Sequence, residues 1–174
     1  MMGDPVHPHP VQRPTRPHHA RGALYTVAAG MLFTNLYGEI LLLETTYKKA
    51  WEIPGGIAER GETARGCARR EVREELGLTC TAGRLLVVDF LPETNTGPGL
   101  IAYIFAGPTL DEGDVDGIIL QRSELKSWAW TSKGDAYTQR LAPAPILASR
   151  LDYAQRALAL NLSYDLVNGS PGAY

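Results

Sequence analysis

The sequence has few residues of the types that most often carry nucleophilic or zinc chemistry. It contains two cysteines, Cys67 and Cys80, among 174 residues, and their spacing matches neither a zinc-binding pattern nor a disulfide framework. All four histidines precede residue 20. The absence of histidine from the rest of the chain excludes Ser-His-Asp and Cys-His mechanisms there. Any general base or metal ligand in that part is therefore a carboxylate or a backbone oxygen.

Long apolar runs and a strong net charge are also missing. No run approaches the ~18 apolar residues that a membrane-spanning helix needs, so we expect no membrane partner. The formal net charge of -2 argues against binding of nucleic acid through a general positive field. A nucleotide needs only a local site and is not excluded. The scarcity of cysteine fits a cytoplasmic protein.

The N-terminal segment, residues 1–21, differs in composition from the rest of the chain. It holds five prolines and has no hydrophobic region, so we predict a disordered tail and not a secretory signal. The chain as a whole is 44% hydrophobic and 21% charged, which is typical of a globular protein. We therefore predict one folded domain over residues 22–162 and a loose C-terminal tail over residues 163–174.

Apolar periodicity divides the predicted domain into strands and helices. Strands are predicted over residues 23–33, 39–47, 50–56, 83–91, 100–108 and 125–131. One helix is predicted from about Thr63 to Leu76, with Gly77 ending it, and a second helical region over residues 135–162 with a proline-rich interruption. Because strands and helices do not alternate regularly, an α+β domain with a mixed sheet is favoured over a doubly wound one.

The first predicted helix gathers acidic side chains on one face. Glu71, Glu74 and Glu75 occupy positions i, i+3 and i+4, where like charges repel by roughly 0.2–0.5 kcal/mol per pair. Arginines lie elsewhere around the cylinder, so the two signs are segregated. One interpretation is a solvated surface face. The other is a site for a hard divalent cation, which binds several carboxylate oxygens and cancels their repulsion.

This helix belongs to a spaced motif. Gly56 is followed by five residues and Glu62, then by seven residues and the run REVREELGL, which extends from Arg70 to Leu78. The pattern resembles the Nudix box, G-x5-E-x7-R-E-U-x-E-E-x-G-U with U an aliphatic residue, and matches it at every position. The resemblance implies the α+β Nudix fold, in which a mixed β-sheet is sandwiched between α-helices.

The resemblance sorts the residues of the motif into metal ligands and structural residues. The implied ligands of Mg²⁺, with Mn²⁺ as an alternative, are the carbonyl of Gly55 and the carboxylates of Glu71, Glu74 and Glu75. The implied structural residues are Gly56, Glu62, Arg70 and Gly77. Among these, Glu62 pairs with Arg70 and so holds the loop against the helix.

The implied activity is hydrolysis of the diphosphate linkage in a nucleoside diphosphate joined to another group, such as an NTP, an oxidised dNTP or an ADP-ribose-like molecule. The catalytic candidates are Glu71, Glu74, Glu75 and Glu124, because the general base of this family is a box glutamate in some members and a later one in others. The resemblance implies Glu124 as the later candidate, because family members often carry an acidic residue about six positions before an aromatic residue on the last strand, here Trp130. The other interpretation of Glu124 is a surface residue at a turn.

Substrate signals are sparse. Tyr47, Lys48, Lys49 and Trp51 flank the expected base pocket, where stacking and phosphate contact are one interpretation and strand-edge packing is the other. The substrate-binding candidates are Tyr47, Lys49 and Trp51. We expect a small-molecule nucleotide as partner, no nucleic acid, and a monomer or homodimer. Two alternatives are a non-catalytic nucleotide-binding sensor of the same fold and an isoprenyl diphosphate isomerase, and the intact motif disfavours both.

Overall fold

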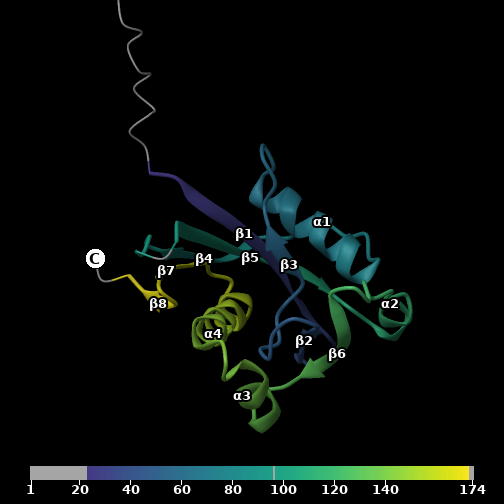
Figure 1. Ribbon diagram of the computed structural model, residues 1–174. Coiled ribbons are helices and arrows are strands. Elements are labelled where there is room, and N and C mark those ends of the chain that lie inside the picture. The colour runs from purple at the N-terminus through teal and green to yellow at the C-terminus, as the bar shows by residue number, and fades with distance from the viewer. Residues whose placement is uncertain (1–22, 96, 173–174) are drawn as a thin grey trace, which may run out of the picture.

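The computed structural model describes residues 23–95 and 97–172. The tail predicted over residues 1–21 lies outside these residues. Within them, strands and helices follow one another irregularly along the chain (Figure 1). The strands are β1 (Tyr25–Thr34), β2 (Ile40–Thr45), β3 (Gly55–Ile57), β4 (Leu85–Leu91), β5 (Gly99–Thr109), β6 (Leu125–Thr131), β7 (Tyr164–Val167) and β8 (Ser170–Pro171). The helices are α1 (Ala64–Leu76), α2 (Glu112–Asp116), α3 (Asp135–Leu141) and α4 (Pro145–Leu160).

The strands form a mixed sheet with the order β6-β2-β1-β5-β4-β7-β8, and β3 pairs with β1 beside this path. The β1–β5 and β4–β7 pairs are parallel, and the other pairs are antiparallel. The long strands β1 and β5 therefore form the centre of the sheet, and helices pack against both of its faces.

Helices cover both faces of this sheet (Figure 1). On one face, α1 buries Cys67, Ala68, Val72 and Leu76 in a cluster with apolar side chains of β1 and β2. On the other face, α3 and α4 contribute to a second cluster with the opposite side of the same strands. Burial of apolar surface on both faces is the main favourable contribution to folding. The predicted mixed sheet between helices is confirmed.

Helix α1 has the bounds that its capping residues predict. The Thr63 side chain accepts a hydrogen bond from the Gly66 amide, which satisfies one free donor of the first turn. Gly77 follows the last helical residue with φ 72°, in the left-handed region that glycine adopts without a Cβ penalty. Both ends of the helix that carries the glutamates are therefore set by local sequence.

Two predicted segments differ from the structure. The strand expected over residues 50–56 is shorter and begins at Gly55, because Glu52 forms only an isolated bridge with Leu43. The C-terminal tail expected to be loose over residues 163–174 contains β7 and β8. Strand β7 pairs with β4 and buries Leu166 completely, a tertiary contact that no local pattern in this short segment reveals. Among the described residues, no helix is long and apolar enough to cross a membrane.

Candidate active site

The site begins where β3 passes close to β1 and α1. A Cβ added to Gly55 would lie 2.6 Å from the Ala29 carbonyl oxygen, and one added to Gly56 would lie 2.4 Å from Glu71 Oε1. A side chain at either position would displace backbone or carboxylate. The two glycines thus allow the Glu71 side chain of α1 to lie directly against the β3 backbone.

Arg70 connects the loop before α1 with the acidic face of the helix. Its guanidinium donates to Glu62 at 2.9 and 3.0 Å, to Glu71 at 2.8 Å and to Glu74 at 3.1 Å. It also donates to the Ile57 carbonyl at 3.1 Å. The hydrogen bond from Arg70 is the main reason that the pKa of Glu62 is lowered. The expected contact between Glu62 and Arg70 is present.

Glu75 is the most buried carboxylate of α1, with 8% of its surface exposed. Its Oε2 accepts a hydrogen bond of 2.9 Å from the Gly55 amide. Burial, together with the neighbouring charges of Glu71, Glu52 and Glu124, raises the pKa of Glu75 to about 8. Burial also raises the pKa of Glu71. Burial therefore disfavours the ionised form of both carboxylates, and Arg70 offsets part of this cost at Glu71 only. Carboxylate oxygens are the ligands that a hard divalent cation prefers.

The three glutamates do not point to one spot. In the described part of the chain, no three acidic, histidine or cysteine side chains are placed together as a ready-made metal cage. Glu74 is turned toward Arg70 and is the most exposed of the three box glutamates. Glu74 is turned away from Glu75 because it forms an ion pair with Arg70, which also forms an ion pair with Glu71. Glu71 and Glu75, next to Gly55 and Gly56, are the pair that fits a cation best.

Glu124 lies near this pair although it is far away in sequence. The segment before β6 is attached to the end of α1, since the Gln121 amide donates to the Glu75 carbonyl at 3.0 Å. The charge of Glu124 contributes to the raised pKa of both Glu71 and Glu75, so its carboxylate is near enough to interact with theirs. Tertiary structure thus brings the later catalytic candidate to the box helix.

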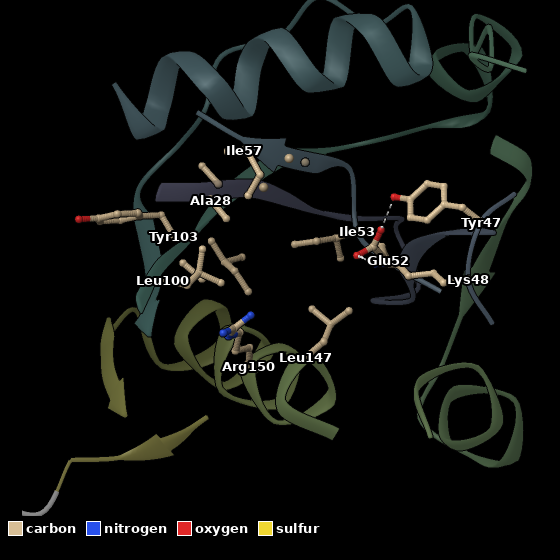
Figure 2. A pocket seen from close by; sticks show the side chains of 16 residues that line it. Ala28, Tyr47, Lys48, Glu52, Ile53, Ile57, Leu100, Tyr103, Leu147 and Arg150 are labelled. Atoms are coloured by element: carbon tan, nitrogen blue, oxygen red, sulfur yellow. Dashed lines mark hydrogen bonds and ion pairs between the residues drawn. The ribbon is translucent and has the colours of Figure 1, made fainter. Parts of the chain in front are cut away.

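A cavity of about 360 Å³ opens beside Gly55 and Gly56 and extends toward α4 (Figure 2). Its size falls in the range of roughly 300–1,000 Å³ that is usual for small-molecule sites. Most of its lining is apolar and comes from β1, β5 and α4. The lining side chains that bear polar groups are Tyr47, Lys48, Glu52, Tyr103 and Arg150.

The three residues expected to bind substrate have different positions. Tyr47 lines the cavity and donates to Glu52 at 3.2 Å, and burial with this neighbour raises the pKa of Tyr47 to about 12. Lys49 and Trp51 do not line it. The Trp51 ring instead lies 4.3 Å from the Arg140 guanidinium, so Trp51 packs α3 against the sheet. The strand-edge interpretation is correct for Trp51.

Lys48, which the sequence placed beside the expected base pocket, lines the cavity, whereas sequence reasoning missed Glu52 and Arg150 as cavity residues. Lys48 and Glu52 form an ion pair at one end of the cavity, four positions apart in an irregular segment that has no helical or strand period. Arg150 lies in α4 among apolar positions. For Arg150, the only signal in the sequence was its charge on the apolar side of a predicted helix. That signal does not show which other residues Arg150 contacts.

The fold and the site together define an α+β domain with an acidic helix beside a cavity of small-molecule size. The sequence model of the NUDIX domain matches residues 24–150. Human 8-oxo-dGDP phosphatase NUDT18 is 33% identical over 105 residues, which cover 58% of this chain and 30% of that protein. CTP pyrophosphohydrolase of Escherichia coli is 33% identical over 113 residues, which cover 63% of this chain and 78% of that enzyme.

Solved structures agree with the sequence comparison. The binary complex of the C. elegans Ap4A hydrolase superposes with a TM-score of 0.59 and 25% identity, covering 77% of this chain and 98% of that one. The chain belongs to the NUDIX domain family. The family and the fold predicted from the box are therefore confirmed.

Proposed function

We propose that the chain is a divalent-metal-dependent hydrolase that cleaves the diphosphate linkage of a nucleoside diphosphate joined to another group. The observation that carries the proposal is the packing of two α1 carboxylates, the half-buried Glu71 and the buried Glu75, against Gly55 and Gly56, which line the cavity. A diphosphate in the cavity would lie beside groups that favour a cation. The named hydrolases among its relatives support this reaction class.

Within this proposal, Glu71, Glu75 and the Gly55 carbonyl would hold Mg²⁺ or Mn²⁺, and Glu74, now next to Arg70, would be a further ligand. Such an ion, when bound, neutralises charge on the diphosphate and makes a water molecule more acidic. Arg70 and Glu62 position the loop and helix. Glu124, or a box glutamate that is not binding the cation, accepts the proton of the attacking water.

The substrate is proposed only as a small-molecule nucleotide. The names of these relatives refer to 8-oxo-dGDP, CTP and Ap4A, which share a nucleoside and a phosphoanhydride and differ in base and in length. NTPs, oxidised dNTPs and ADP-ribose-like molecules all contain this common part. We expect the protein to act on them in the cytoplasm as a monomer or homodimer.

A substrate screen tests the proposal. The full chain is incubated with NTPs, 8-oxo-dGTP, 8-oxo-dGDP, Ap4A and ADP-ribose in the presence of Mg²⁺, Mn²⁺ or EDTA, and products are separated by chromatography. We expect cleavage of a phosphoanhydride in at least one compound with metal and none with EDTA. Binding without products under every metal condition would favour the non-catalytic sensor instead.

A further inference from the structure

The side of α1 that faces away from the sheet borders a groove of about 160 Å³. This α1 groove is lined by Gly66, Arg69, Arg70, Arg73, Thr79 and Cys80. The first four lie within a sector of about 100° on the helix, and the other two belong to the segment that follows it. That segment runs back along the helix, since the Arg65 side chain donates to the carbonyls of Ala82 and Gly83. The α1 groove shares no lining residue with the cavity beside Gly55 and Gly56.

Two arginines of the α1 groove have no acidic partner. Within residues 23–95 and 97–172, the side chains of Arg69 and Arg73 form neither an ion pair nor a hydrogen bond. No acidic residue lies three or four positions from either of them on the helix, and they are four positions from each other, where like charges repel. Other arginines do find acceptors, since Arg84 and Arg122 donate to backbone carbonyls. The two positive charges of the α1 groove are therefore uncompensated.

The carboxylates of α1 lie on the other side of Arg70. The Arg70 guanidinium pairs with Glu62, Glu71 and Glu74, and none of these three residues lines the α1 groove. Because these carboxylates are already paired, they repel an anion in the groove less than free carboxylates would. The segregation of charge around α1 therefore produces two sites of opposite preference, one for a cation and one for an anion.

The wall opposite the helix adds neutral groups. Burial raises the pKa of the Cys80 thiol and the charge of Arg69 partly opposes this effect, so the Arg69 guanidinium lies near Cys80. Thr79, the preceding residue, is exposed and contributes a hydroxyl group. Gly66 has no side chain to fill the space beside the arginines. The α1 groove thus has two guanidinium groups and one hydroxyl as donors.

The size and the donors of the α1 groove indicate which anion fits it. Its volume is below the roughly 300–1,000 Å³ of sites for larger small molecules, so a whole nucleotide does not fit. A carboxylate has two oxygens and matches a single guanidinium fork. A phosphate group has more oxygens and a charge of about −1.5 to −2 near pH 7, and so accepts from both forks and from the hydroxyl.

We propose that the α1 groove is a phosphate-binding site, separate from the cavity of the proposed active site. Arg69 and Arg73 bind the phosphate oxygens through their guanidinium forks, and Thr79 donates from the opposite wall. The ligand is inorganic phosphate or a phosphate monoester whose remaining part stays outside the groove. This site goes beyond the proposed function and does not depend on nucleotide hydrolysis.

The experiment locates phosphate on the full chain by NMR. Isotope-labelled protein, freed of metal on a chelating resin, is titrated with sodium phosphate, and sodium chloride keeps the ionic strength constant. We expect saturable shifts of the amide signals of Gly66, Thr79 and Cys80 at millimolar phosphate. The signals of Gly30 and Leu100, which line the cavity, should move less. A parallel titration with glycerol 3-phosphate distinguishes the two sources, because the true class of ligand binds more tightly.

Substitutions assign the binding to individual side chains. Arg69→Gln and Arg73→Gln should each weaken phosphate binding by about 3- to 10-fold, because each removes one charged donor at a partly exposed site. The double variant should show no saturable shift. Its melting temperature should not fall, because neither side chain has a partner in the described fold and their repulsion is removed. Thr79→Val, which removes only the hydroxyl, should also weaken binding.

Two more variants separate a built site from a general positive field. Arg69→Lys/Arg73→Lys keeps both charges but loses the planar forks, so phosphate binding should weaken. Arg156→Gln removes one exposed positive charge from α4 and should leave the phosphate affinity unchanged.

Three results would overturn the proposal. The first is the absence of a saturable shift at the α1 groove in the wild type. The second is the same phosphate affinity in Arg69→Gln/Arg73→Gln as in the wild type. The third is an equal loss of affinity in Arg156→Gln and in the α1 variants, which would mean that phosphate responds only to net charge.

Discussion

At the scale of single residues, the burial of Glu75 has the largest chemical consequence. Its carboxylate is buried beside other carboxylates and accepts one backbone hydrogen bond. Its pKa of about 8 means that the folded protein binds the proton more tightly than the unfolded chain does. Such a group stabilises the fold most fully below its unfolded pKa, and this contribution disappears as the pH rises through the folded value.

We therefore predict that the metal-free protein becomes less stable between about pH 5 and pH 8, and that Glu75→Gln removes much of this dependence. Glutamine keeps an oxygen for the Gly55 amide and carries no charge. The same variant should lower kcat by about 10²–10⁴-fold with metal, the range for loss of a main electrostatic or acid–base group. Denaturant titrations in EDTA across this pH range and rate measurements with Mg²⁺ check the two expectations.

Glu93→Gln is the control, since Glu93 is exposed in the loop after β4. The Glu93→Gln variant should change neither the pH dependence of stability nor kcat. A Glu75→Gln protein that retains the wild-type loss of stability toward pH 8, and also the wild-type kcat, would show that the buried carboxylate has no part in either effect.

At the scale of elements, the contact between β3 and α1 decides where Glu71 lies. A Cβ at Gly56 would lie 2.4 Å from Glu71 Oε1, so Gly56→Ala must push the carboxylate away. We predict a fall in kcat of about 10²-fold, because a displacement of about 1 Å can cost that much. The far-ultraviolet circular dichroism spectrum should stay unchanged, since Gly56 has no left-handed φ.

Gly97→Ala is the matched control, because a Cβ at Gly97 meets no atom within 4 Å. Steady-state rates of both variants and of the wild type are compared at saturating metal. Equal rates for Gly56→Ala and Gly97→Ala would mean that the position of Glu71 against β3 does not matter for catalysis.

The C-terminal strand β7 is an integral element and not an appendage. Leu166 is completely buried against the α4 side of the sheet, whereas Val167 is 42% exposed. We predict that Leu166→Ala lowers the free energy of unfolding by about 2–5 kcal/mol, as for other buried leucines. Val167→Ala, the neighbouring control, should change it by about 0.5 kcal/mol or less. Denaturant unfolding measures the free energy of unfolding of both variants. If both lose only a similar small amount of stability, the C-terminal segment is a loose tail, as the sequence predicted.

At the scale of the whole molecule, the chain consists of a family domain with a segment at each end. The family match begins at residue 24, and the first 21 residues have no apolar periodicity. We predict that deletion of residues 1–21 leaves the melting temperature and kcat/KM nearly unchanged. Thermal melts and rate measurements on the shortened and full chains check this. Loss of most of kcat/KM after deletion would indicate that this segment reaches the site.

Local sequence alone determined the box helix and its ends. The N-cap at Thr63, the apolar spacing of α1 and the left-handed Gly77 depend on contacts within a few residues, so the helix could be predicted within one residue of its observed start. The ends of the long strands β1, β2, β4, β5 and β6 were predicted within two residues, and the break between α3 and α4 was predicted from its prolines. The resemblance of the motif then implied the fold and the class of chemistry.

Tertiary structure alone decided what the glutamates and the other charged residues face. Arg70 turned out to contact Glu71 and Glu74 as well as Glu62, and Trp51 packs on Arg140 and not in the cavity. The partners Asp89, Arg150 and Gly169 are separated by tens of residues and come together only through the pairing of β7 with β4 and the packing of α4. Periodicity reports which face of an element is buried, but contacts between distant elements depend on sheet order and register, which no local pattern contains.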